Sequence, residues 1–163
     1  MNQPKPVEIL LVEDNPADAE LAQIGLRQGK ILNQVHVVED GESAIEFLRR
    51  EGEHAEAPTP DLILLDLNLP GMDGREVLEV IKGDQTLRLI PVVVLTTSDA
   101  ELDIRKAYSS YANAYMTKPV NFKQFHELMS GLEDYWFRLV RLPSSLTNDE
   151  HSVHAGRAVG VSE

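Results

Sequence analysis

Four places in the sequence carry an acidic, hydroxyl or ammonium side chain directly after an apolar segment. The residues at these places are Glu13, Asp14, Asp66, Thr96 and Lys118. If the apolar segments are parallel strands of one sheet, their carboxyl ends lie at one edge, which brings these side chains together. Three carboxylates about 5 Å apart repel one another by roughly 3 kcal/mol per pair at an effective dielectric constant of about 20, so a cation is needed between them. The sequence therefore predicts a divalent-metal site at this edge.

The metal and the acidic residues suggest phosphoryl chemistry. Mg²⁺, or Mn²⁺ in its place, suits the site because such cations take carboxylate, water and phosphate oxygens as ligands. An ionised carboxylate beside the metal can attack phosphorus and form an aspartyl phosphate. The metal and an ammonium group then neutralise the phosphoryl oxygens. Asp66 is the predicted nucleophile because it ends the central apolar segment.

Five apolar segments are the predicted strands that position these residues. Their bounds are 7–12, 35–38, 61–66, 91–96 and 114–117. The first, third and fourth are nearly continuous in apolar residues rather than alternating. This pattern is typical of strands that are covered on both faces of a parallel sheet.

Apolar residues recur at helical spacing between the strands. The predicted helices are marked by residues 21–28, 44–48, 77–81, 100–110 and 122–139. Pro16 favours the first turn of the first helix, and either Asp14 or Asn15 is expected to cap it. Asp14 could cap the helix and bind metal at once. Five strands alternating with five helices predict an α/β fold with right-handed crossovers.

Length and composition predict one globular domain. The 163 residues are about one domain's worth. We expect an N-terminal extension at 1–6, the domain at 7–142 and a polar, flexible tail at 143–163. No apolar run approaches the roughly 20 residues that cross a bilayer, and the first residues lack the apolar region of a secretion signal. A cytoplasmic protein is therefore expected.

Charge and missing motifs exclude several function classes. The chain has 15 basic and 27 acidic residues, a net charge of −12, which disfavours direct binding to nucleic acid. It has no cysteine, so disulfides, thiol catalysis and cysteine-based zinc sites are excluded. It also lacks a Walker A or G-x-G-x-x-G sequence, so nucleotide binding has no support.

The acidic pair Glu13-Asp14, Asp66 within Leu-Asp-Leu-Asn-Leu-Pro-Gly-Met-Asp-Gly, Thr96 after Val-Val-Val-Leu, and Lys118-Pro119 occur together in one chain. With this spacing, they resemble the receiver domain of two-component response regulators over about 7–142. The resemblance implies a five-stranded parallel sheet in a (βα)5, flavodoxin-like doubly wound fold. It also implies that Asp66 accepts a phosphoryl group from a sensor histidine kinase. Such a protein acts chemically on itself and is not a turnover enzyme.

The resemblance further implies a role for each site residue. The metal would be held by Glu13, Asp14, Asp66 and the backbone carbonyl of Asn68. Lys118 would pair with the carboxylate or the phosphoryl group, and Thr96 would move toward the latter. Tyr115 would be an aromatic switch coupled to Thr96, although plain core packing is the alternative. Asn68 and Ser98 occupy positions that tune dephosphorylation.

The chain also resembles the small phytochrome-associated response regulators. The resemblance rests on Leu-Asn-Leu-Pro-Gly-Met-Asp-Gly-Arg-Glu-Val-Leu, on Pro-Val-Val-Val-Leu-Thr-Thr-Ser, and on the aromatic residues Tyr135, Trp136 and Phe137. A phytochrome-type histidine kinase is thus one expected partner. Segment 122–139 carries more apolar residues than one core-facing stripe needs, so we expect a homodimer through these aromatics. The alternative is that the tail folds back over them.

Two other functions remain open. The first is an adaptor that uses only its interface and needs no phosphorylation; the intact acidic cluster and Lys118 argue against it. The second is a phosphohydrolase that acts on small molecules. Such an enzyme would need an inserted segment to cap its substrate, and the sequence offers none. Receiver output, without a DNA-binding domain, is expected through the face built from 100–110, 114–117 and 122–139.

Overall fold

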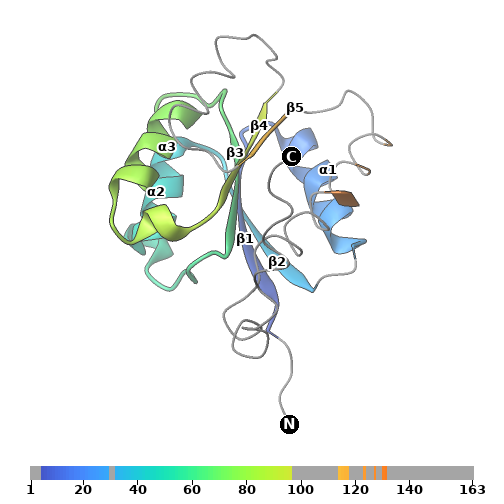
Figure 1. Ribbon diagram of the computed structural model, residues 1–163, viewed down its shortest axis with the longest axis horizontal. Helices are drawn as coiled ribbons and strands as arrows, with labels where there is room; N and C mark the ends of the chain where they lie inside the picture. The colour runs from blue at the N-terminus through green and yellow to red at the C-terminus, as the bar shows by residue number, and fades with distance from the viewer. Residues whose placement is uncertain are drawn as a thin grey trace, which may run out of the picture.

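The computed structural model describes residues 5–29, 32–96 and 114–117, together with positions 123, 127, 130 and 131. Its strands are β1 (Val7–Val12), β2 (Asn33–Val38), β3 (Leu62–Asp66), β4 (Val92–Thr96) and β5 (Ala114–Thr117). They form one sheet in the order β2-β1-β3-β4-β5, and every neighbouring pair is parallel (Figure 1). The connections reverse direction between β1 and β3, so ligands are expected beyond the carboxyl ends of these two strands.

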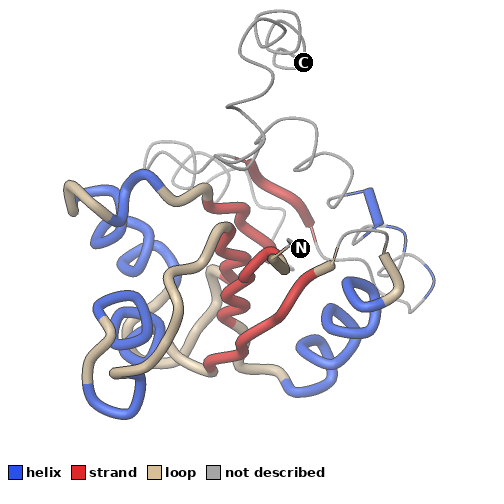
Figure 2. The backbone as a smooth tube through the Cα atoms, turned by 90° about the horizontal axis from the view of Figure 1, so that it is seen from below, coloured by secondary structure: helices blue, strands red, loops and turns tan. Residues whose placement is uncertain are grey.

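Helices cover both faces of the sheet. They are α1 (Pro16–Arg27), α2 (Gly41–Arg49) and α3 (Gly74–Gly83), with short 3₁₀ turns η1 (Gly52–His54) and η2 (Leu87–Leu89). Helices α2 and α3 lie on one side of the sheet and α1 on the other (Figure 1). Figure 2 shows the strands as a central layer between the helices.

The buried core is divided by the sheet, because successive side chains of a strand point to opposite faces. One cluster joins the sheet to α2 and α3 and includes Leu10, Val12, Ile63, Leu65, Phe47, Leu78 and Ile81. The other joins it to α1 and includes Ile9, Leu11, Leu62, Leu64, Ala22 and Leu26. Both faces of β1 and β3 are therefore largely covered, which explains their nearly continuous apolar sequences.

The ends of α2 and α3 are fixed by local hydrogen bonds. Asp73 caps α3 in a capping box, in which its side chain accepts from the Glu76 N–H and the Glu76 side chain accepts from the Asp73 N–H, both at 3.1 Å. Helix α2 begins at the cap Asp40. It ends at Arg50, whose backbone is left-handed with φ 58°. The Arg50 N–H and the next N–H both return to carbonyls of the last turn, as in a Schellman motif.

Two charged side chains hold the connection between α3 and β4. Asp84 Oδ1 accepts hydrogen bonds from the N–H groups of Thr86 and Leu87 at 2.8 and 2.9 Å. These bonds, that of Leu87 first, lower the pKa of the Asp84 carboxyl. Lys82 Nζ donates to two carbonyl oxygens just before β4, each at 3.2 Å. The entry of β4 into the sheet is therefore fixed from α3.

The predicted parallel α/β sheet is confirmed, and the strand bounds agree within one residue except at β2, which begins at Asn33 rather than at position 35. Predicted helix 100–110 and the tail at 143–163 lie outside the described residues. Of predicted helix 122–139, only positions 123, 127, 130 and 131 are described, and all four are helical. Among the described helices, none has both the length and the apolar character that a membrane crossing requires.

Candidate metal centre

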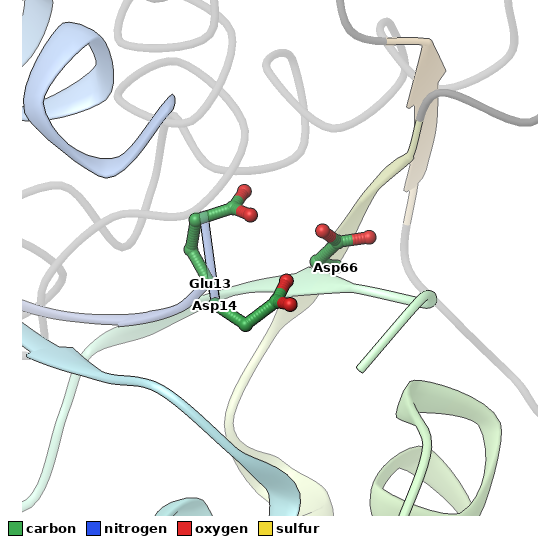
Figure 3. A group of neighbouring side chains, drawn as sticks. All are labelled: Glu13, Asp14 and Asp66. Carbon is green, nitrogen blue, oxygen red and sulfur yellow. The ribbon is translucent and has the colours of Figure 1, made fainter. Parts of the chain in front are cut away.

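Three carboxylates meet at the carboxyl ends of β1 and β3. Glu13 and Asp14 follow directly on β1, and Asp66 is the last residue of β3. These strands are hydrogen-bonded neighbours, with Val12 in register with Leu65, so their next residues lie side by side. Each residue offers a ligand oxygen, and these oxygens lie within 4.8 Å of one another (Figure 3). The structure thus brings together the acidic residues that the sequence analysis singled out.

Two of these carboxylates are buried. Glu13 is 4% exposed and Asp66 is 5% exposed, whereas Asp14 is exposed. Over the described residues, Glu13 and Asp66 are the buried charged side chains. Buried like charges at this separation are costly unless a cation lies among them. The all-oxygen ligand set fits a hard divalent cation such as Mg²⁺ or Mn²⁺.

Backbone N–H groups orient the two buried carboxylates. The N–H of Asn15 donates to Glu13 Oε2 at 3.1 Å, and the N–H of Asn68 donates to Asp66 Oδ1 at 2.9 Å. Both bonds span two residues, so each carboxylate is held by the turn that follows its own strand. This arrangement fixes the ligand oxygens before a metal binds, which lowers the cost of binding.

The cap of α1 is Asn15, not Asp14. Asn15 Oδ1 accepts from the N–H groups of Ala17 and Asp18 at 2.9 and 3.1 Å. The prediction that Asp14 caps this helix is therefore wrong, whereas its place in the acidic cluster is confirmed. Since the neighbouring asparagine satisfies the helix end, capping places no demand on the exposed Asp14 carboxylate, which lies in the acidic cluster.

Gly74, which the sequence analysis did not single out, makes room for the turn after Asp66. A Cβ at this position would lie 2.3 Å from the Asp66 carbonyl oxygen and 2.5 Å from Leu67 Cα. The Gly74 N–H donates to the Leu67 carbonyl at 3.0 Å, which closes the loop between β3 and α3. The signal in the sequence is the Met-Asp-Gly before the third helix, but only the packed backbone reveals its role.

The other predicted residues are placed only in part. Thr96 is the last residue of β4, and the residue before it, Leu95, is in register with Asp66 of β3. The side chain of Thr96 lies outside the described part of the structure. The backbone of Tyr115 pairs with β4, and its side chain is likewise not described. The side chain of Asn68 is exposed. Predicted residues that lie outside the described part of the chain are Ser98, Lys118, Tyr135, Trp136 and Phe137.

Known proteins share this sequence and fold. The family model "Response regulator receiver domain" matches residues 9–130. Response regulator Rcp1 of the cyanobacterium Synechocystis sp. is 46% identical over 140 residues, which cover 86% of this chain and 95% of that protein.

Two crystal structures are similar over most of the chain. One is the phosphorylated cyanobacterial phytochrome response regulator RcpA, with 49% identity and a TM-score of 0.81; the match covers 85% of this chain and 99% of that one. The other is the Mn²⁺-bound form of Rcp1, with 46% identity, a TM-score of 0.79 and the same coverage.

Family match, fold and acidic cluster agree. The match spans the sheet from β1 to β5, and the cluster of Glu13, Asp14 and Asp66 is typical of receiver metal sites. Among the proteins similar to this chain, RcpA is a phytochrome response regulator solved in its phosphorylated form, and Rcp1 is a response regulator solved with Mn²⁺ bound. The chain belongs to the response regulator receiver domain family, whose members are signalling proteins of two-component systems.

Proposed function

We propose that this protein receives a phosphoryl group on Asp66 from a sensor histidine kinase, with Mg²⁺ bound by Glu13, Asp14, Asp66 and the backbone carbonyl of Asn68. One observation carries the proposal. Three carboxylates, two of them buried, lie with ligand oxygens within 4.8 Å at the switch point of a parallel sheet.

The chemistry follows from how these residues are held. When bound, the metal neutralises negative charge on the carboxylates and on the phosphoryl oxygens. An oxygen of Asp66 attacks phosphorus; the new O–P bond forms as the P–N bond to the kinase histidine breaks, and the imidazole leaves. The Asn68 N–H keeps the Asp66 carboxylate oriented during the attack. Glu13 and Asp14 act as metal ligands and take no part in bond making.

The remaining roles belong to the same proposal. Lys118 pairs with the phosphoryl group, and Thr96 and Tyr115 report its arrival to the face that includes β5. Asn68 and Ser98 tune its loss. The domain comprises residues 7–142 with five βα units, and 143–163 form a tail.

The partner is a phytochrome-type histidine kinase. The names of the relatives support this choice, because RcpA is a phytochrome response regulator that was crystallised in its phosphorylated form. We also propose a homodimer in which Tyr135, Trp136 and Phe137 contribute the contact, and a site of action in the cytoplasm. No step of the proposal needs nucleic acid or a membrane.

Incubation with Mg²⁺ and acetyl phosphate, followed by intact-mass measurement, tests the proposal. The protein should gain one phosphoryl group, Asp66→Asn should gain none, and Asp14→Asn should gain it slowly. Glu20→Gln is the matched control, because Glu20 is an exposed carboxylate of α1 outside the cluster, and it should react like the unaltered protein.

The alternatives give different results in the same experiment. An adaptor that acts only through its interface would show no mass gain in the unaltered protein. A phosphohydrolase would release phosphate from members of a small-molecule panel, and Asp66→Asn would abolish that release. Either result would replace the proposed function.

A further inference from the structure

The first residue of α2 makes a close contact with the loop between β3 and α3. An alanine Cβ at the buried Gly41 would lie 2.5 Å from the Met72 carbonyl oxygen and 2.8 Å from Val77 Cγ2. Cβ contacts below 3.0 Å essentially do not occur, so one of the two segments would have to retreat by about 0.5 Å or more. Beside it, the Glu42 carboxylate lies next to Gly71 of the same loop.

The loop side of this contact leads to Asp66. The loop is closed at its base by the hydrogen bond from the Gly74 N–H to the Leu67 carbonyl, and Gly74 packs on the Asp66 backbone. Within the loop, the Asn68 N–H holds the Asp66 carboxylate. A displaced Met72 carbonyl would therefore shift the loop that orients Asp66 and carries the proposed carbonyl ligand.

The helix side of the contact leads to Glu13. Helix α2 follows β2 after a short turn, and the carbonyl of Val38, the last residue of β2, accepts a hydrogen bond from the Glu13 N–H at 3.0 Å. If α2 retreated instead of the loop, it would pull on this bond. Both segments that meet at Gly41 and Met72 are thus tied to opposite ligands of the acidic cluster.

We infer that Gly41 is a positioning residue that sets the spacing of the metal-ligating groups, through the contact of its bare Cα with the Met72 carbonyl. The inference rests on the proposed metal site and adds a residue that does not touch it. A residue that sets this spacing should affect which divalent metal the site prefers. Mg²⁺ demands oxygen ligands at about 2.0–2.1 Å in near-ideal octahedral geometry, whereas Ca²⁺ tolerates about 2.3–2.6 Å and irregular shells. A widened site should therefore lose Mg²⁺ affinity more than Ca²⁺ affinity.

Calorimetric titration of Gly41→Ala with Mg²⁺ and with Ca²⁺ tests the inference. The Mg²⁺ dissociation constant should rise about tenfold, as is usual when groups that orient metal ligands are disturbed, and the Ca²⁺ constant should rise less. Gly83→Ala is the matched control, because a Cβ there meets nothing within 4 Å; it should bind both ions like the unaltered protein. A lower melting temperature in chelator with unchanged Mg²⁺ and Ca²⁺ constants would show a packing role only and overturn the inference.

Adding Val77→Ala to Gly41→Ala separates the two close contacts. Val77→Ala removes the Cγ2 atom but leaves the Met72 carbonyl, so the double variant should keep the loss of Mg²⁺ affinity relative to Val77→Ala alone. Recovery of Mg²⁺ affinity would assign the effect to helix packing and overturn the inference.

Hydrogen exchange of the unaltered protein gives a readout that needs no variant. Coupling is reciprocal, so saturating Mg²⁺ should slow exchange in residues 41–44 and leave 82–84 unchanged. Unchanged exchange at 41–44, despite bound Mg²⁺, would contradict the inference alone. Failure of the unaltered protein to bind Mg²⁺ at all would instead remove the proposed function on which it rests.

Discussion

Asp66→Asn should make the metal-free protein more stable. Asparagine is nearly isosteric with aspartate and can still accept the Asn68 N–H, so the substitution removes a charge while leaving packing intact. The charge lies within 4.8 Å of those of Glu13 and Asp14. For the buried pair of Glu13 and Asp66, the repulsion is about 3 kcal/mol at an effective dielectric constant of about 20. The exposed Asp14 is screened by water and adds less.

The net gain will be smaller than this repulsion, because the native cluster can relax and the unfolded chain also carries charge. We expect the free energy of unfolding to rise by about 2 kcal/mol, which corresponds to roughly 4–8 °C in melting temperature for a domain of this size. Urea unfolding near neutral pH in the presence of a chelator measures it. Glu20→Gln, which removes an exposed charge of α1, should change the free energy by less than about 0.5 kcal/mol.

Metal should reverse the order of stabilities. Mg²⁺ that binds only the folded state stabilises the unaltered protein in proportion to the logarithm of its concentration, and Asp66→Asn should gain little. A metal-free Asp66→Asn variant that is equal to or less stable than the unaltered protein would refute the idea that the cluster is strained by like charges. The acidic side chains would then be stabilised in the folded protein by interactions that need no cation.

Three further predictions concern other parts of the chain. Arg50→Gly should raise the free energy of unfolding by about 0.5 kcal/mol, because glycine adopts the left-handed backbone without strain but loses more freedom on folding; urea unfolding measures it, and a decrease would refute strain at this position. Asp84→Asn should flatten the acid limb of the stability curve: the lowered pKa of Asp84 stabilises the fold above its ordinary pKa of 3.8, and that contribution is lost as pH falls through the lowered value. The free energy of unfolding measured against pH tests this prediction, and an unchanged pH dependence between about pH 5 and pH 2 would contradict it. Trp136→Ala should shift the protein toward monomer in light scattering, and an unchanged mass would exclude a central role for Trp136 in dimerisation.

Much of the fold could be predicted from the sequence because burial on both sheet faces leaves a direct trace. The nearly continuous apolar runs identified β1, β3 and β4 almost to the residue. Strand β2 was harder, because it lies at the edge of the sheet and begins with the polar residues Asn33 and Gln34, which pair with Val7 and Glu8. Polar residues in an edge strand interrupt the apolar pattern, so that part of the strand resembles a loop in the sequence.

The acidic cluster could also be predicted, because parallel strands of one sheet end at the same edge. What the sequence does not reveal is how the cluster is held. Asp14 and Asn15 are equally good caps, and only the fold shows that Asn15 takes this role. Gly41 and Gly74 matter through atoms from distant segments that approach them, and such contacts leave no local pattern.

The most direct test of the account locates the phosphoryl group. The protein is treated with Mg²⁺ and acetyl phosphate and then with borohydride, which reduces an aspartyl phosphate to homoserine, and the modified peptide is sequenced by mass spectrometry. Homoserine should appear at position 66, should depend on the divalent metal and should be absent without the phosphodonor. Modification at another carboxylate, or none at position 66 while Mg²⁺ is bound, would contradict it.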